Sequence, residues 1–273
     1  MVSLKQGNQV EAVVSEPSFE IITTLAYSVN LPLNPQASSQ SCCYLLQHGV
    51  DRLKAAALDL SWTAVVNYLS EGNRTASLEQ EIADYMLSVH GDDSKDPSRR
   101  FIVRLALKKD AKLSILSGPR PTSPNELYYP LQLSPSPLTT PSIPVYLDLE
   151  ITTSSVFTKH KTTYRQPYSA AWNRVGLDET VSPATCDVLL YNSNGHIMGS
   201  VFRTVYFWRN GAFVTPSSET GCKMGVSRRW AVENAGVKET FISAGEVKEG
   251  EMIWLSSAVG GFIQGTVTLK GRI

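Results

Sequence analysis

Residues 119–144 read PRPTSPNELYYPLQLSPSPLTTPSIP and carry eight of the fifteen prolines of the chain. Proline has no backbone N–H and fixes φ, so this stretch cannot sustain a helix or a central strand. We therefore predict an interlobe linker here. It would separate an N-terminal lobe over residues 1–118 from a C-terminal lobe over residues 145–273, each of ordinary domain size.

The N-terminal lobe mixes strand and helix patterns, which indicates an α+β lobe. Apolar runs typical of buried strands occupy residues 19–27, 101–107 and 112–116. The last two flank a polar turn and so predict a hairpin. Apolar residues recur at helical spacing over residues 53–68 and 78–89. At the start of the second of these helices, Ser77 and Gln80 are suited to a capping box.

The C-terminal lobe is predicted to be larger and rich in strands. Its strand-like runs are residues 145–151, 186–191, 197–208, 212–215, 252–255 and 262–269. Asn-Gly pairs begin at Asn194 and Asn210 and separate three of these runs. They predict a β-meander, because both central residues of a type I′ turn need positive φ. Helices are expected over residues 164–175 and 227–235.

Composition and charge argue against several classes of partner. The chain has 25 basic and 25 acidic side chains, so its formal charge is zero and its pI is near 6.9. Binders of nucleic acid or anionic membrane need a basic face, so we expect neither partner. No apolar run is long enough to span a membrane and no secretory leader is recognisable, so a cytoplasmic location is expected. The four cysteines lack metal-ligand spacing, so we expect no metal site.

Three separated segments carry residues suited to a small-molecule site. Arg52, near the start of a predicted helix, can bind a phosphate, although an exposed helix arginine is the commoner case. Residues 157–165 contain Lys159 and Lys161. A buried lysine here would lose its proton and attack a carbonyl, although most such lysines face solvent. Residues 221–228 form a glycine-bounded loop that enters a helix, which suits either phosphate binding or ordinary N-capping.

The order of these segments resembles the fold-type-IV pyridoxal-phosphate enzymes, the class-IV aminotransferase family, and within it the fungal-type aminodeoxychorismate lyases. The Arg-Leu pair at Arg52 matches the segment that holds the cofactor phosphate in the family. The sequence FTKHKTTYR at 157–165 matches the segment that carries the Schiff-base lysine, and Gly-Val-Ser-Arg at 225–228 matches the motif that closes on the phosphate. The resemblance spans residues 18–270. It implies a two-lobed fold with a small N-terminal α/β lobe, a larger β-rich C-terminal lobe, pyridoxal 5′-phosphate between them, and a homodimer.

The resemblance also assigns roles to single residues. Lys161 is implied to be the catalytic Schiff-base lysine. It is preferred to Lys159 because the Thr-Thr-x-Arg part of the motif follows it, whereas both lysines would point the same way on an extended segment. The implied cofactor-binding positions are Arg52, Val226, Ser227, Ser257 and Gly199. The implied substrate-pocket positions are Tyr164 and Arg203.

Gly199 is the sharpest departure from the family pattern. It falls where the family has a glutamate whose carboxylate pairs with the pyridine nitrogen of the cofactor and keeps it protonated. Arg203 lies four residues along and is expected on the same strand face, where it is the candidate substitute. An arginine there would leave the nitrogen unprotonated. Ser257 likewise stands where the family has an asparagine.

Three hypotheses for function remain open. The first is a pyridoxal-phosphate-dependent lyase or aminotransferase that resembles aminodeoxychorismate lyase and eliminates pyruvate from an amino-chorismate-type substrate. The second is a cofactor-independent lyase, isomerase or cyclase of specialised metabolism on the same scaffold, because the glutamate of the family is missing at Gly199. The third is a non-catalytic binding or dimerisation protein. A yellow protein with bound cofactor would favour the first.

Overall fold

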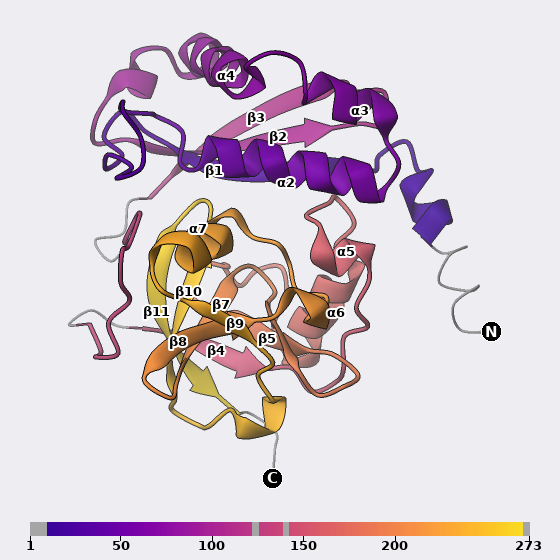
Figure 1. The fold of residues 1–273 in the computed structure, drawn as a ribbon, viewed down its shortest axis with the longest axis vertical. Coiled ribbons are helices and arrows are strands. Elements are labelled where there is room, and N and C mark those ends of the chain that lie inside the picture. The colour runs from indigo at the N-terminus through magenta and orange to yellow at the C-terminus, as the bar shows by residue number, and fades with distance from the viewer. Residues whose placement is uncertain (1–9, 122–125, 139–141, 270–273) are drawn as a thin grey trace.

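The computed structural model describes residues 10–121, 126–138 and 142–269 and arranges them in two lobes (Figure 1). In that view the N-terminal lobe, indigo to magenta, lies above the C-terminal lobe, pink to yellow. The upper lobe has one small sheet with helices, and the lower lobe has one large sheet with shorter helices. The predicted α+β class, with a larger β-rich C-terminal lobe, is confirmed.

The N-terminal sheet is three-stranded and antiparallel, in the order β1-β2-β3. Its strands are β1 (Ile21–Tyr27), β2 (Arg100–Leu107) and β3 (Leu113–Arg120). The predicted hairpin is formed by β2 and β3. Because side chains alternate along a strand, Phe101, Val103, Leu105 and Leu107 all point to one face, where they are buried.

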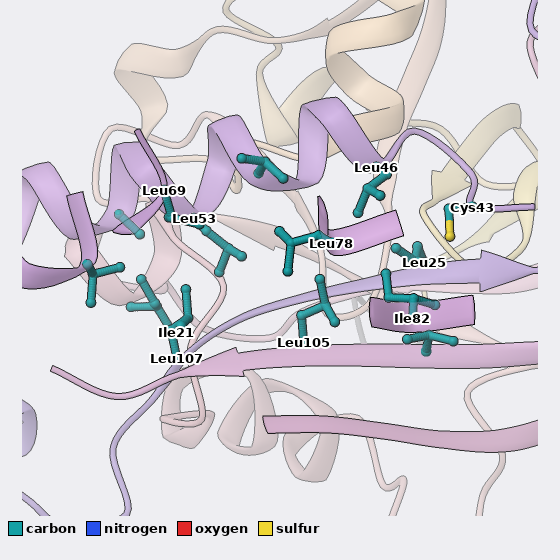
Figure 2. Packing of buried hydrophobic residues seen from close by; sticks show 14 of the residues in the cluster. Ile21, Leu25, Cys43, Leu46, Leu53, Leu69, Leu78, Ile82, Leu105 and Leu107 are labelled. Carbon is teal, nitrogen blue, oxygen red and sulfur yellow. The ribbon is translucent and has the colours of Figure 1, made fainter. Parts of the chain in front are cut away.

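Helices cover that face of the sheet. They are α2 (Leu46–Asp59), α3 (Thr63–Tyr68) and α4 (Arg74–His90), which continues into a 3₁₀ turn (Gly91–Lys95); residues 10–14 are also helical. Figure 2 shows Leu53, Leu78 and Ile82 from the helices packed against Ile21 and Leu105 from the strands. Among the described residues, no helix is both long and apolar enough to cross a membrane.

Two details of the predicted helices are wrong. The pattern over 53–68 is divided between α2 and α3, because the chain turns at Ser61, whose φ of 57° is left-handed. The predicted capping box of Ser77 and Gln80 lies inside α4. The cap is instead Asn73, whose side chain accepts a hydrogen bond from the backbone N–H of Ala76 at 3.2 Å.

The C-terminal lobe contains a mixed eight-stranded sheet in the order β6-β5-β4-β11-β10-β7-β8-β9. Its strands are β4 (Ile143–Leu147), β5 (Asp187–Tyr191), β6 (Ile197–Ser200), β7 (Thr204–Arg209), β8 (Ala212–Pro216), β9 (Lys238–Thr240), β10 (Met252–Ser257) and β11 (Gly261–Thr268). The helices are α5 (Val156–Lys159), α6 (Gln166–Arg174) and α7 (Val226–Asn234), with 3₁₀ turns at Ser218–Thr220 and Ala244–Glu246. The two predicted longer helices correspond to α6 and α7.

Both Asn-Gly pairs form hairpin turns, but the predicted meander is wrong. The hairpins are β5–β6 and β7–β8, and β4, β11 and β10 lie between them in the sheet. The apolar run 197–208 is broken after Ser200, whose backbone N–H donates to the Arg203 carbonyl at 3.0 Å. This tight turn, entered through Gly199 at a φ of 121°, sends β7 to another part of the sheet.

The proline-rich segment is packed on the C-terminal lobe. Tyr128 and Tyr129 are buried, and the indole N–H of Trp230 donates to the Pro130 carbonyl at 3.0 Å. The indole N–H of Trp254 donates to the Ser134 carbonyl at 2.8 Å. The ends of the predicted linker lie in β3 and β4, and its residues 122–125 and 139–141 are outside the described part of the chain.

Candidate functional site

A cavity of about 590 Å³ lies between the two lobes. The N-terminal lobe lines it with residues of β1, β2 and α2, and the C-terminal lobe with residues of β10, β11 and the start of α7. Its cationic side chains are Arg52, Arg120, Lys161, Arg165, Arg203 and Lys223. The one carboxylate among the described lining residues is Glu126, which is paired with Arg120. The cavity is therefore suited to an anionic ligand.

Lys161 reaches the cavity because its segment is held against β1. The backbone N–H of Ile22 donates to the Lys161 carbonyl at 2.9 Å, and that of Thr163 donates to the Glu20 carbonyl at 2.9 Å. The Lys161 amine donates to Thr24 Oγ1 at 2.7 Å, and no carboxylate of the described residues pairs with it. Burial holds the pKa of Lys161 well below its usual range, and the nearby Arg52 guanidinium lowers it further. The amine is therefore available as a nucleophile or base.

Lys159 lies outside this cavity. It ends α5, and its amine is ion-paired with Asp59 Oδ2 at 2.6 Å on an exposed surface. The buried His160 imidazole contacts the same carboxylate at 2.7 Å. Because α5 is helical and the chain becomes extended only after it, the two lysines do not point the same way, contrary to the assumption of one extended segment.

Arg52 and the start of α7 form one end of the cavity. The Arg52 side chain is buried, its Nη2 contacts Thr23, and its Nε has no hydrogen-bond partner among the described residues. Within the described chain no side chain caps α7, so its first N–H groups are free to meet an anion. The buried Ser227 hydroxyl makes no well-aligned hydrogen bond with any described residue, although it lies near the Tyr44 hydroxyl. These orphaned donors fit a phosphate.

Two contacts bring α7 to α2, which it faces across the lobes (Figure 1). Arg229 of α7 is ion-paired with Asp51 of α2 at 2.5 Å, and His48 Nδ1 lies 3.4 Å from the Val226 carbonyl. Gly225, just before α7, lies close to the start of β7, where a Cβ would lie 2.9 Å from Thr204 Oγ1. The Asp51-Arg52 pair and the Gly225-Val226 pair, far apart in sequence, thus meet at one site.

Gly199 and Arg203 are arranged differently from the prediction. Gly199 lies in β6 and lines a small adjoining cavity, whereas Arg203 lies in the turn after β6. They therefore do not share a strand face. The Arg203 guanidinium lines both cavities, but it donates to Asp187 Oδ2 at 3.0 Å and to the Pro183 carbonyl at 2.7 Å. Arg203 is held by these acceptors and is not free to replace the missing glutamate.

The two remaining predicted site residues, Ser257 and Tyr164, lie in different places in the structure. Ser257, at the end of β10, lines the interlobe cavity, and its Oγ accepts a hydrogen bond from the Gly260 N–H at 3.0 Å. Tyr164, which was predicted in the substrate pocket, is not among the residues that line this cavity. It packs on Phe157 with ring centroids 4.6 Å apart and lines a different hollow.

Sequence reasoning missed three polar side chains that surround Lys161 in the cavity. Thr24 accepts the hydrogen bond from its amine, and Arg165 and Lys223 line the same space. Arg165 had a signal, because it follows Lys161 by four residues and so returns to the same side. For Lys223 the sequence signal was its position in a glycine-bounded loop, which does not indicate where its side chain points.

Comparison with known proteins decides the family. A family model described as amino-transferase class IV matches residues 45–266, which is most of the chain. The chain belongs to this family. The class IV aminotransferase chain is also 32% identical over 139 residues to aminodeoxychorismate lyase of Saccharomyces cerevisiae. That match covers 46% of this chain and 37% of the yeast protein, so it spans well under half of the relative.

Solved structures of class IV aminotransferases share the fold. A branched-chain aminotransferase from Thermoproteus uzoniensis superposes with a TM-score of 0.63 at 12% identity, over 94% of this chain and 80% of that one. A 4-amino-4-deoxychorismate lyase from Pseudomonas aeruginosa gives a TM-score of 0.57 at 15% identity, over 91% and 82%. The fold-type-IV architecture expected from the sequence is thereby confirmed.

Proposed function

We propose that this chain is a pyridoxal-phosphate-dependent enzyme, a lyase or aminotransferase that resembles aminodeoxychorismate lyase and eliminates pyruvate from an amino-chorismate-type substrate. The observation that carries the proposal is the Lys161 amine, buried at an interlobe cavity with a lowered pKa. Membership of the family and the partial similarity to the yeast lyase support it. A homodimer, a cytoplasmic location and a place in specialised metabolism stay predictions.

The phosphate-binding end of the cavity and Lys161 fit the cofactor, whereas the region beside Gly199 does not. Arg52, the Val226 N–H and Ser227 would hold its phosphate, and Lys161 would carry its aldehyde carbon. Beside Gly199 the described residues offer no carboxylate to a pyridine nitrogen, because the nearby Asp187 is occupied by Arg203. Bound pyridoxal phosphate would supply an electron-accepting ring.

The residues of the chain would supply binding and proton transfer. The Lys161 Nζ would take a proton from the substrate carbon and return it as a general acid. Thr24 Oγ1 accepts the hydrogen bond that orients this amine. Ser257, which also lines the cavity, is proposed to contact the phosphate side of the ligand.

The proposal is tested by adding pyridoxal phosphate to the purified chain, reducing with borohydride and mapping the modified peptide. A yellow absorbance band and an adduct on Lys161 would support it. An adduct confined to Lys159 would contradict the assignment of the lysine. No binding at all, with turnover of a chorismate-type substrate, would favour a cofactor-independent lyase, isomerase or cyclase.

Arg52→Ala is expected to weaken cofactor affinity about ten- to a hundredfold. A charge-assisted hydrogen bond to a phosphate contributes about 1.5–3 kcal/mol. Titration of the variant with pyridoxal phosphate measures the change, and Lys54→Ala on the same helix is the control outside the cavity lining. Unchanged affinity would contradict the role, and loss of the folded lobe would make Arg52 structural.

Gly199→Glu and Gly199→Ala form a matched pair. Both place a side chain at a φ of 121°, so each is expected to lower the free energy of unfolding by about 1–3 kcal/mol. Only the glutamate adds a carboxylate, which would raise the pKa of a pyridine nitrogen and increase cofactor-dependent turnover about tenfold over the alanine variant. Equal or lower turnover of the glutamate variant would mean that the cavity does not use a protonated ring.

A further inference from the structure

Lys223 is a second lysine of the interlobe cavity, next to the small hollow at Gly199. It lies in the loop between β8 and α7, which the Met224 N–H ties to the Lys159 carbonyl at 3.0 Å. Its amine donates to the Val201 carbonyl at 3.2 Å and lies 4.5 Å from the centroid of the Tyr168 ring. Lys223 lines both cavities, so its partly exposed side chain faces the space that Lys161 also lines.

Lys223 and Arg165 make this part of the cavity cationic. The Arg165 guanidinium lies 5.3 Å from the centroid of the same Tyr168 ring and 5.0 Å from that of Phe202. In the part of the chain that the structure describes, neither cation is ion-paired with a carboxylate. The carboxylate that acts on both cations, Asp187, is itself ion-paired with Arg203. Two partly buried cations without a paired carboxylate of their own favour an anionic ligand.

We propose that Lys223 is a second amine nucleophile, which forms an imine with a small α-keto acid whose carboxylate binds Arg165. The neutral Nζ adds to the carbonyl carbon, and a proton moves from nitrogen to oxygen to give a carbinolamine. Loss of water then leaves a C=N bond, so one amine and one carbonyl give one imine and one water. The step needs no oxidant or reductant and does not depend on a cofactor at Lys161.

The surroundings of Lys223 supply the neutral amine. Burial is the largest influence and lowers its pKa to about 7. Arg165 and Arg52 lower the pKa as well, whereas Asp187 and Cys222 raise it. Near pH 7 about half of the amine is therefore unprotonated, in contrast to an ordinary surface lysine.

The test uses glyoxylate with cyanoborohydride, which reduces an imine to a stable secondary amine, followed by peptide mapping. In Lys161→Met, which removes the other buried amine, Lys223 is expected to be labelled first, half-maximally near pH 7. Lys161→Met/Lys223→Met should lose this fast label. Lys159→Met, which alters an exposed ion-paired lysine, is the control and should not change it. The wild-type chain is mapped in parallel, so the result does not depend on one variant.

The role of Arg165 is tested with a neutral aldehyde. Arg165→Gln is expected to slow labelling of Lys223 by glyoxylate about tenfold more than labelling by acetaldehyde, because a charge-assisted contact to the carboxylate is lost. The rise in the pKa of Lys223 that follows the loss of Arg165 slows both reactions alike. Labelling spread over exposed lysines without preference for Lys223 would overturn the proposal. So would labelling of Lys223 that rises only near the pH of an ordinary lysine. Since these measurements omit pyridoxal phosphate, failure here leaves the proposed function standing.

Discussion

Lys161→Met should abolish covalent attachment of pyridoxal phosphate and lower cofactor-dependent turnover on the order of a thousandfold or more. Methionine approximates the length of lysine and needs no charge, so it fills the position without burying a new ion. The amine that it removes donates to Thr24 and lies beside the Arg52 guanidinium, where the described residues offer no acidic partner. Absorbance after cofactor addition, mass spectrometry and turnover measure the loss.

Lys159→Met is the matched control for this experiment. Lys159 is two residues away but lies on the exposed surface in an ion pair with Asp59, which contributes at most about 1 kcal/mol. The control should keep both attachment and turnover. If Lys161→Met still carried the cofactor on another lysine, or if both variants lost activity equally, Lys161 would not be the lysine that binds it.

Local periodicity was sufficient where a strand or helix buries one face. The alternation of Phe101, Val103 and Leu105 places these residues against the helices, and the polar turn that follows fixes the hairpin of β2 and β3. The helices α6 and α7 likewise agree with their predicted ranges. In each case neighbours in sequence carry the whole pattern.

Periodicity failed where distant segments decide the path of the chain. The run 197–208 is mostly apolar, and nothing in it says that β6 pairs with β5 while β7 pairs with β10. The prolines of the segment 119–144 explain why it is neither a helix nor a central strand. They do not show that the indole N–H groups of Trp230 and Trp254 donate to its carbonyl groups. The contacts of the proline-rich segment join residues 100 and 120 positions apart, and the pairing of β7 with β10 joins residues several tens of positions apart.

The candidate site was predicted only in part, because long-range contacts bring some of its residues together. The ordered motifs located Arg52, Lys161 and the start of α7, which the fold brings to one cavity. They did not reveal Lys223 beside Gly199, because that neighbourhood requires the loop after β8 to meet the turn after β6. The hydrogen bond from Lys223 to the Val201 carbonyl is a contact that makes this meeting.

Asp187→Ala is expected to destabilise the protein by about 3–5 kcal/mol, because it leaves the charge of Arg203 without its partner. The Asp187 side chain is fully buried, and its Oδ2 accepts hydrogen bonds from the Ser200 hydroxyl at 2.7 Å and from Arg203 at 3.0 Å. Its Oδ1 accepts from the backbone N–H of Phe202 at 3.2 Å. One carboxylate thus fixes the whole turn between β6 and β7.

Urea unfolding measures the loss of stability in Asp187→Ala, and two further variants test its cause. Asp51→Ala removes the exposed carboxylate that pairs with Arg229, so a loss below about 1 kcal/mol is expected. In Asp187→Ala/Arg203→Met the stranded charge is gone as well, so part of the stability should return. No recovery would mean that Asp187 acts through the backbone N–H groups of the turn instead.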